Sequence, residues 1–202
     1  MMKLLAAGAS PFVRKVRLTA SVKGLGGQLE VIQPDDPGID QLKARNPLGK
    51  IPVLLCDDGM TIFDSHVICE YLDGKAASPV LFPGDGQARW EMLTRAALAD
   101  GILEAGVLIV YEKRFRPEDK YVESWVAMQQ TKINAAVAEL EAAPPKWKDH
   151  PDYGHITVAA ALGYLDFRQD GKWREANPNM VRWLEEFRQA VPGFDETAPP
   201  AS

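Results

Sequence analysis

Apolar and polar residues follow two kinds of pattern along the chain, and the first kind is confined to its first 75 residues. Lys3–Ala7 is a short apolar run and Leu29–Ile32 alternates between apolar and polar positions, so both segments predict strands. The apolar run Ile51–Leu55 and the segment Met60–Phe63 flank a turn of two aspartates and a glycine at 57–59. This arrangement predicts a β-hairpin.

Two helices are predicted among these strands. Pro11–Lys23 has apolar residues at helical spacing, with Ser10 at the N-cap, a proline at the first helical position and a cluster of glycines after its end. Phe63–Asp73 contains the start of the second helix, with Asp64 or Ser65 as its cap. The order of strand, helix, strand, strand, strand and helix predicts a small α/β unit.

The rest of the chain has apolar residues at helical spacing and no pattern typical of strands. Trp90–Arg114 predicts one long helix, and Pro117 is expected to open the next one. Ile156–Phe167 is apolar almost all the way round, which predicts a buried helix. The last clear helix is Pro178–Ala190, and residues 193–202 are expected to form a tail.

Glycine, proline and alanine are frequent in residues 74–87, so we interpret this stretch as a linker between the two patterns. We expect an α/β domain at residues 1–75, a linker at 76–87 and an all-helical domain at 88–202. A chain of 202 residues is long enough for two such domains to bury real cores without support from disulfides.

Net charge excludes one class of function. The formal net charge is −5, whereas a nucleic-acid-binding protein usually has a basic excess. The basic residues Arg14, Lys15 and Arg17 form only a small cluster, which we interpret as a solvated helix face. We therefore expect no nucleic-acid partner.

The lengths of the apolar segments and the spacing of the cysteines indicate in which cellular compartment the protein is expected. No segment has the uninterrupted apolar length of a membrane span, and the apolar run near the N-terminus is too short for a signal peptide. Cys56 and Cys69 do not have the spacing of metal ligands, and the three histidines do not cluster with them. We predict no membrane partner, no metal site and no disulfide, and we expect a cytoplasmic protein with reduced thiols.

Three short segments contain candidate binding chemistry, and the first is Asn46–Leu54, with the sequence NPLGKIPVL. Pro52 stands at the mouth of a strand, where proline is tolerated only at a first or edge position. A cis Ile51–Pro52 bond would leave the N–H and C=O of Ile51 unpaired, and these groups can pair with an extended peptide ligand. A trans proline that only blunts an edge strand is the alternative, and spacing alone favours it.

The second segment is Phe63–Asp73, with the sequence FDSHVICEYLD, at the start of a predicted helix. Backbone N–H groups at a helix start attract a carboxylate, Ser65 adds a hydroxyl donor, and Asp64 can accept from an ammonium group. Together these groups suit a ligand end that carries both charges, as an amino acid does. A simple N-cap is the alternative, and the segment taken alone favours it.

The third segment is the helix start at Ser10 and Pro11, where the positive helix end and a hydroxyl both face whatever lies beside Ser10. A free thiol has a pKa of about 8.5, and lowering it by two requires roughly 2.7 kcal/mol. A hydrogen bond to a charged group contributes about 1.5–3 kcal/mol, and the helix end contributes roughly 0.3–1 kcal/mol. One hydroxyl and one helix end are therefore enough to ionise a bound thiol, although many helices start with Ser-Pro and have no such role.

Taken together, these segments and the helical half resemble the glutathione S-transferase family over essentially the whole chain. The resemblance rests on Ser10–Leu18 (SPFVRKVRL), Asn46–Leu54 and Phe63–Asp73, in this order. Ala97–Gly106 (ALADGILEAG) and Ala161–Arg168 (ALGYLDFR) are similar to the bacterial branch of the family, of omega-, theta- or beta-like cytosolic type. The family implies a thioredoxin-like domain, a helical domain and usually a homodimer.

The resemblance also implies a glutathione site in the first domain. Ser10 would be the catalytic residue and would face the sulfur of glutathione. The cysteinyl backbone would pair with the residue before a cis proline, and side chains would hold the two charged ends of the peptide. The glutathione-binding positions implied are Phe12, Lys50 beside the glycyl carboxylate, Ile51, Pro52, and Asp64 and Ser65 at the γ-glutamyl end.

The second substrate implied by the resemblance is a small hydrophobic electrophile in the cleft between the domains. Tyr111 and Phe115, late in the first long helix, are candidates for its apolar wall, together with Phe12. Asp100 is a candidate for contact with the glutathione of the partner subunit. Glutathione acts as a co-substrate in this scheme, and no metal is involved.

The chain departs from the family patterns at several positions. Lys3–Ala7 contains no tyrosine, so classes with a catalytic tyrosine near the first strand have no match. Ser10 stands where the omega-like pattern has a cysteine, which argues against mixed-disulfide transfer. Ala9 stands where theta- and delta-like patterns have the activating serine. The cap of the buried helix is Asp152 with His155, in place of a Ser or Thr with an acid three residues later.

Three functions follow from these residues. The leading one is a glutathione transferase that ionises bound glutathione and presents the thiolate to a hydrophobic electrophile. The second is a binding or interaction protein that has the same fold but little conjugating activity, because fold alone does not determine function. The third is a glutathione-dependent thiol reductase or peroxidase, which the absence of a cysteine at position 10 disfavours.

Overall fold

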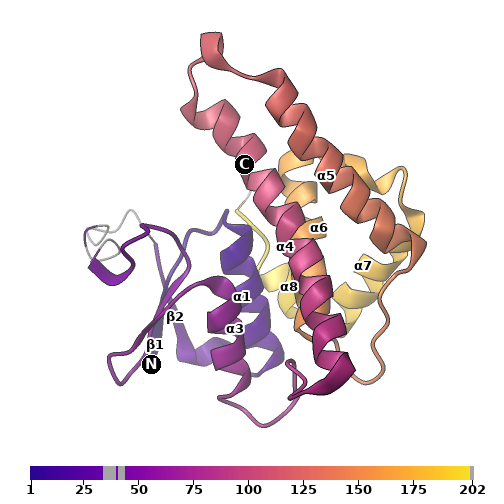
Figure 1. The fold of residues 1–202 in the computed structure, drawn as a ribbon. Coiled ribbons are helices and arrows are strands. Elements are labelled where there is room, and N and C mark those ends of the chain that lie inside the picture. The colour runs from indigo at the N-terminus through magenta and orange to yellow at the C-terminus, as the bar shows by residue number, and fades with distance from the viewer. Residues whose placement is uncertain (34–39, 41–43, 201–202) are drawn as a thin grey trace. The chain divides into compact units, whose positions relative to one another are not determined.

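A computed structural model describes residues 1–33, 40 and 44–200 of the chain. The chain forms two compact units, one of Met1–Gly84 with the segment that begins at Val191, and the other of Asp85–Ala190 (Figure 1). The boundary at residues 84 and 85 falls inside the stretch interpreted as a linker. We expected the helical domain to continue to residue 202, but the segment after Ala190 packs with the first unit instead.

The first unit contains a four-stranded mixed sheet with the strand order β2-β1-β3-β4. Strands β1 and β2 are parallel, whereas β3 is antiparallel to both β1 and β4. The predicted strands are confirmed, and so is the hairpin, whose turn places Gly59 at φ +86°. The bounds of the strands are β1 (Met2–Leu5), β2 (Leu29–Ile32), β3 (Val53–Leu55) and β4 (Thr61–Ile62).

The helices of this unit are α1 (Pro11–Val22) and α3 (Ser65–Asp73), which pack together, and the short α8 (Gly193–Glu196). A 3-10 turn, η1 (Gly26–Gln28), joins α1 to β2. Helix α8 contradicts the expectation that residues 193–202 are only a tail. It lies against α1 (Figure 1).

The basic face of α1 is buried, so the interpretation of Arg14 and Lys15 as part of a solvated face is wrong. Their exposed fractions are 6% and 1%. The guanidinium of Arg14 lies 4.0 Å from the ring centre of Phe194 and donates to the Phe194 carbonyl at 2.8 Å. Helix α8 covers this part of α1, and a contact between residues 180 positions apart leaves no local trace in the sequence.

The stretch interpreted as a linker is partly fastened to the first unit. Lys23 forms a buried ion pair with Asp73 at 2.8 Å. The Asp73 carboxylate also accepts the N–H groups of Leu81 and Phe82 at 2.9 and 3.1 Å. Both of these residues are buried, so this part of the stretch is packed into the first unit.

The second unit is all helical, as predicted, and α4 packs against both α5 and α6. Helix α4 begins four residues before the expected start at Trp90. Pro117 does not open the next helix, because a 3-10 turn comes first and α5 begins at Glu123. The bounds are α4 (Gly86–Phe115), η2 (Glu118–Lys120), α5 (Glu123–Ala142), α6 (Tyr153–Gln169), η3 (Lys172–Arg174) and α7 (Pro178–Ala190).

Helix α6 is the core of this unit, and its residues from Tyr153 to Leu165 are all buried, as predicted. The predicted cap is also confirmed. Asp152 Oδ1 accepts the N–H of His155 at 3.0 Å, and the His155 ring lies 3.1 Å from the N–H of Asp152. Asp152 also forms an ion pair with Arg95 of α4 at 2.5 Å, so the same carboxylate caps α6 and ties it to α4.

Helices α4 and α6 approach each other closely at two glycines. A Cβ atom on Gly154 would lie 2.8 Å from the carbonyl oxygen of Met92 and 2.7 Å from Nε of Arg95. A Cβ atom on Gly106 would lie 3.0 Å from the ring of Tyr164. Since the oxygen of Met92 belongs to the backbone, the contact at Gly154 cannot be relieved by turning one side chain.

We predict that Gly154→Ala lowers the free energy of unfolding by about 1–3 kcal/mol, because the added methyl group overpacks the α4–α6 contact. Gly101→Ala is the matched control, since a Cβ atom there meets nothing within 4 Å and the site is inside α4. The control should gain about 0.5–1 kcal/mol. Urea unfolding followed by circular dichroism measures both; equal effects of the two substitutions would contradict the close contact.

The pKa of the Asp152 carboxyl gives a second prediction. Burial raises this pKa, but hydrogen bonds from His155 and the charge of Arg95 outweigh burial and hold it below the usual range. An unfolded aspartate titrates at about 3.9. The stabilisation by ionised Asp152 is therefore complete above that pH and is lost as the pH falls through the lower folded value.

Asp152→Asn should keep the cap but lose the charge, and so lower the free energy of unfolding at pH 7 by about 1–2 kcal/mol. The difference between wild type and variant should shrink as the pH falls below about 4. Unfolding curves at pH 7, 5 and 3.5 test this; a difference that is the same at all three would argue against the charge interaction.

Candidate functional site

Three loops that contain candidate residues meet at one end of the four-stranded sheet. Strand β1 is antiparallel to β3, with Leu5 opposite Val53, so the loop after β1 lies beside the start of β3. Strand β4 is also antiparallel to β3, with Ile62 opposite Leu54. The end of β4 therefore lies beside the start of β3 as well. Sheet pairing alone therefore brings together the end of β1, which leads to Ser10, the start of β3, which follows Ile51 and Pro52, and the end of β4, which leads to Asp64.

A small apolar cluster fixes the loops on this edge. Its buried members are Leu5 of β1 and Val53 of β3. Ile32, Ile51 and Phe63 pack against the pair. Since Ile51 directly precedes Pro52 and Phe63 directly precedes Asp64, the cluster positions the backbone on both sides of the candidate site.

Ser10 occupies the N-cap of α1. Its N–H donates to the Ala7 carbonyl at 2.9 Å, and its hydroxyl oxygen accepts the N–H of Val13 at 3.4 Å. Within the described residues, the hydroxyl proton of Ser10 has no acceptor of its own. The cap therefore uses only the oxygen, and the hydroxyl can still donate to an anion in front of the positive end of α1.

The bond between Ile51 and Pro52 is cis, as the family resemblance implied and contrary to what spacing alone favoured. The bond between Phe63 and Asp64 is cis as well. Neither the N–H nor the C=O of Ile51 has a hydrogen-bond partner in the described part of the chain. An extended peptide can pair with this open backbone by the geometry of an added strand.

Asp64 and Ser65 stand at the start of α3, where Asp64 is the N-cap. Asp64 Oδ1 accepts the N–H groups of His66 and Val67 at 3.0 and 3.4 Å. Among the described residues, no hydrogen bond involves the second oxygen, Oδ2. Asp64 is exposed, whereas Ser65 is 4% exposed. The capping role and an ammonium-binding role are thus compatible, because they use different oxygens.

Lys50 is exposed and stands directly before Ile51. Its backbone is held by Asn46, a residue to which the sequence analysis gave no role. The buried Asn46 side chain donates from Nδ2 to the Lys50 carbonyl at 2.9 Å and accepts the N–H of Leu48 at 3.0 Å. The Asn-Pro pair at 46–47 is a turn signal in the sequence. This signal does not by itself indicate that the Asn46 side chain holds the backbone of a binding residue.

Phe12 lies in the first turn of α1, two residues after Ser10, and is partly exposed. The Lys15 ammonium lies 5.7 Å from the centre of its ring. The ring is thus available on the same helix end as the Ser10 hydroxyl. All seven candidate residues of the first unit lie in the three loops at this sheet edge or in the first turn of the helix that follows: Ser10, Phe12, Lys50, Ile51, Pro52, Asp64 and Ser65.

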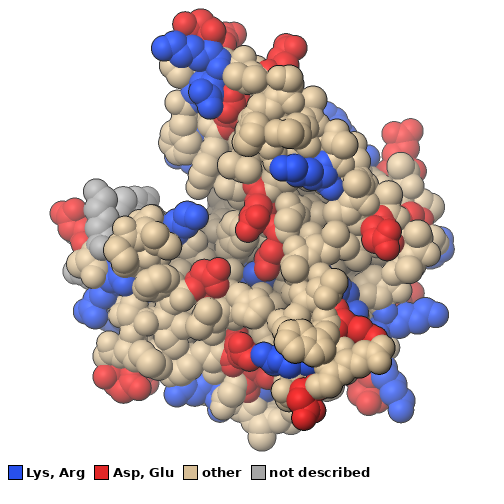
Figure 2. Space-filling view, in the orientation of Figure 1, with Lys and Arg blue, Asp and Glu red and all other residues tan. Residues whose placement is uncertain are grey.

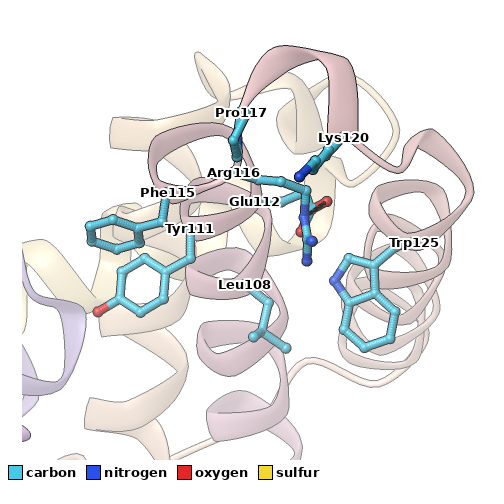
Figure 3. A pocket seen from close by; sticks show the side chains of 8 residues that line it. All are labelled: Leu108, Tyr111, Glu112, Phe115, Arg116, Pro117, Lys120 and Trp125. Carbon is cyan, nitrogen blue, oxygen red and sulfur yellow. Dashed lines mark ion pairs between the residues drawn. The ribbon is translucent and has the colours of Figure 1, made fainter.

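The second unit has a hollow of about 430 Å³ at the C-terminal end of α4 (Figure 3). Tyr111 and Phe115, the two residues expected to form an apolar wall, both line it. Their rings meet edge to face with centres 5.1 Å apart, and they are 50% and 67% exposed. Exposed aromatic pairs of this kind are typical of ligand or interaction surfaces rather than of a solvated helix face.

The opposite wall of the hollow comes from residues that the sequence analysis did not assign to a site. Leu108 and Arg116 point toward Trp125 of α5, whereas Tyr111 and Phe115 project from another side of α4 (Figure 3). The i,i+4 spacing of Glu112 and Arg116 was a signal for their contact, but it did not indicate that a hollow would form there.

Glu112 shapes this end of α4. It is 5% exposed and pairs with Arg116 Nε at 2.5 Å. The same Oε1 accepts the N–H of Val122 at 3.2 Å. One buried carboxylate thus holds both ends of the connection between α4 and α5, which includes Pro117 and Lys120 of the hollow.

Asp100 lies half-buried on α4 of the second unit. Within residues 1–33, 40 and 44–200, no group of His, Cys, Asp or Glu side chains could hold a metal ion. Cys56 and Cys69 are both buried.

The face of the molecule shown in Figure 2 has acidic and basic side chains interspersed over it, with no broad basic area among the residues drawn. None of the helices in the described residues is both long enough and apolar enough to span a membrane.

Comparison with known families gives two matches, one in each half of the chain. A family model described as "Glutathione S-transferase, N-terminal domain" matches residues 9–75. A second, described as "Glutathione S-transferase, C-terminal domain", matches residues 123–186. The first match contains Ser10 and the loops that hold Ile51 and Asp64, and the second begins at α5.

Individual relatives match over the full length. The "Uncharacterized GST-like protein YibF" of Escherichia coli (strain K12) is 34% identical, and the match covers 98% of this chain and 99% of the relative. A crystal structure of a glutathione transferase family member from Pseudomonas fluorescens Pf-5, with bound glutathione, has a TM-score of 0.92 and 41% identity, with 100% of both chains covered. A glutathione S-transferase from Methylobacillus flagellatus KT with bound GSH has a TM-score of 0.87 and 33% identity, covering 99% of this chain and 100% of that one.

Proposed function

The chain belongs to the glutathione S-transferase family, and we propose that it is a glutathione transferase that conjugates glutathione to a small hydrophobic electrophile. The observation that carries the proposal is the hydroxyl of Ser10. It lies at the positive end of α1, in a loop at the same sheet edge as the open backbone of Ile51, and its proton has no acceptor among the described residues. Relatives with bound glutathione, at 41% and 33% identity, support the choice of ligand.

Glutathione would bind along the sheet edge as an extended peptide. The N–H and C=O of Ile51 would pair with the cysteinyl residue, as an added strand does. Oδ2 of Asp64 would accept from the ammonium of the γ-glutamyl end, while the hydroxyl and the backbone N–H of Ser65, the first residue of α3, would donate to its carboxylate. The ammonium of Lys50 would lie near the glycyl carboxylate, while Asn46 holds the Lys50 backbone through its carbonyl.

The sulfur would then face Ser10. A hydroxyl donor to the thiolate contributes about 1.5–3 kcal/mol, and the end of α1 adds roughly 0.3–1 kcal/mol. Since each 1.36 kcal/mol corresponds to a change of one in pKa, these two groups lower a thiol pKa of about 8.5 to roughly 6–7. The bound thiol would be largely ionised at neutral pH, and holding the electrophile beside it would provide much of the rate.

The electrophile would use the exposed aromatic pair of the second unit. Tyr111 and Phe115 offer ring faces and edges to an apolar group, and the hollow beside them has room for a small molecule. We further propose that the protein acts as a homodimer in which Asp100 reaches the glutathione of the partner subunit.

Ser10→Ala should raise the pKa of bound glutathione by about 1–2, because the hydrogen bond to the thiolate is lost. Thiolate absorbance near 240 nm, titrated with pH in the presence of saturating glutathione, measures the shift. Ser10→Thr is the matched control, because it keeps the hydroxyl and the helix cap and should retain most of the thiolate at pH 7.

The same titration separates the proposal from its alternatives. A binding protein without transferase chemistry would bind glutathione with the thiol pKa close to that of free glutathione in wild type. An unchanged pKa on binding would therefore refute the proposed mechanism. A thiol reductase would instead turn over a mixed disulfide faster than an aryl halide.

Asp64 provides a second prediction for the same site. Asp64→Asn should weaken glutathione binding by about tenfold, because the ammonium loses its charged partner, while the helix cap remains. Asp64→Ala should lose the cap as well and melt at a lower temperature. Calorimetric titration and thermal melts of both variants test the separation; an Asn variant with wild-type affinity would exclude Asp64 from the γ-glutamyl subsite.

A further inference from the structure

The segment Val191–Pro200, which we call the C-terminal strap, begins beside α1 and ends beside the loop that contains Ser10. Its first part forms α8, which packs on α1 (Figure 1). Its last described residue, Pro200, lies against Gly8, two residues before Ser10. The strap belongs to the same compact unit as that loop, although about 190 residues separate the two in sequence.

Arginine side chains of α1 anchor the start of the strap. Arg14 stacks on the ring of Phe194 with 4.0 Å between guanidinium and ring centre, and it donates to the Phe194 carbonyl at 2.8 Å. Arg17 donates to the Glu196 carbonyl at 3.2 Å. These two residues are one turn apart on α1, so their hydrogen bonds fix α8 on the helix that Ser10 caps.

Close packing adds to these hydrogen bonds. A Cβ atom on Gly193 would overlap the hydroxyl of Ser21, so α8 and α1 approach each other as closely as a glycine allows. Thr197 is 5% exposed and closes the end of α8 through a hydrogen bond to the Gly193 carbonyl at 2.7 Å. The strap is therefore anchored up to Thr197, and only the three residues after it extend toward the loop.

The strap contacts the loop through Pro200, which lies against Gly8. A Cβ atom on Gly8 would lie 3.3 Å from Cδ of Pro200, so the proline ring rests directly on the glycine backbone. The residue before Pro200 is also a proline, and the fixed φ angle of proline limits how far this end of the strap can move. The loop from Ala7 to Ser10 is half-buried as a result.

We propose that the C-terminal strap is a positioning element for Ser10, and that Pro200 acts on the hydroxyl through Gly8. The Ser10 N–H donates to Ala7, so the backbone on which Pro200 rests is the same turn that orients the serine. Loss of the contact makes this turn more mobile, so the Ser10 hydroxyl no longer stays oriented for a hydrogen bond to the sulfur of bound glutathione. The proposal rests on the proposed function in one respect, namely that the hydroxyl donates to a thiolate.

The test compares a chain that stops after Ala198 with a chain that stops after Pro200. The shorter chain loses both prolines and keeps every anchor up to Thr197, so the two should melt at about the same temperature. Amide hydrogen exchange at Ser10, whose N–H donates to the Ala7 carbonyl, should be about tenfold faster in the shorter chain when it is measured without ligand. Equal exchange in the two chains would overturn the proposal.

A second readout tests the effect on the thiolate. If the strap positions the hydroxyl, the shorter chain should bind glutathione with a higher thiol pKa, so that about threefold to tenfold less thiolate is present at pH 6. Faster exchange with an unchanged thiol pKa would overturn the positioning role. If the chain that stops after Pro200 forms no thiolate with bound glutathione, the proposed function fails. The hydrogen-exchange result still decides whether the strap holds the loop.

Pro200→Gly in the full chain gives an independent check. This substitution keeps the backbone but removes the ring that rests on Gly8, so it should reproduce the faster exchange and the higher thiol pKa. Pro192→Gly is its matched control, since Pro192 is exposed at the start of α8 and has no contact with Gly8. Equal exchange of the Ser10 amide in the two variants would contradict a specific role for Pro200.

Discussion

The antiparallel pairing of β1 with β3 is the constraint on which the candidate site depends. With Leu5 opposite Val53, the chain leaves β1 at the point where it enters β3. The loop before Ser10 and the cis bond at Pro52 are therefore neighbours before any side chain contributes. A register slip of one residue would turn Leu5 and Val53 away from the core they share. The apolar cluster therefore fixes the strand register, and the register places the loops of the candidate site next to one another.

Helix caps illustrate how the same local motif can be structural in one place and available for binding in another. Asp152 is the cap of α6, and its carboxylate is consumed by His155 and Arg95. Asp64 caps α3 with one oxygen only, and Ser10 caps α1 with a lone pair while its proton has no acceptor among the described residues. The sequence identified Ser10 and Asp152 as caps and left Asp64 and Ser65 as alternatives at the start of α3. Only the packing around them shows which retain a free atom, and that depends on residues far away in the chain.

This distinction also explains how much of the molecule was predictable. The strands, the hairpin, the buried helix α6 and its unusual Asp152–His155 cap follow from local patterns and are confirmed. The interpretation of Arg14 as solvated is wrong because its partner is Phe194, and no local signal announces that contact. The late start of α5 likewise depends on the buried carboxylate of Glu112, whose role needs the three-dimensional arrangement. Caps, turns and strands could be predicted from neighbouring residues, whereas contacts between residues far apart in the chain could not.

The composition of the loop before Ser10 makes such long-range partners necessary. Residues 6–9 are Ala, Ala, Gly and Ala, so the loop has no large side chain with which to anchor itself. A group that stabilises a transition state or a thiolate must be held within a fraction of an ångström, and small residues on a loop cannot supply that precision. The support has to come from outside, from β1 on one side and from Pro200 on the other. Small residues also let a peptide backbone approach closely, so the feature that admits the ligand is the same one that makes the external support indispensable.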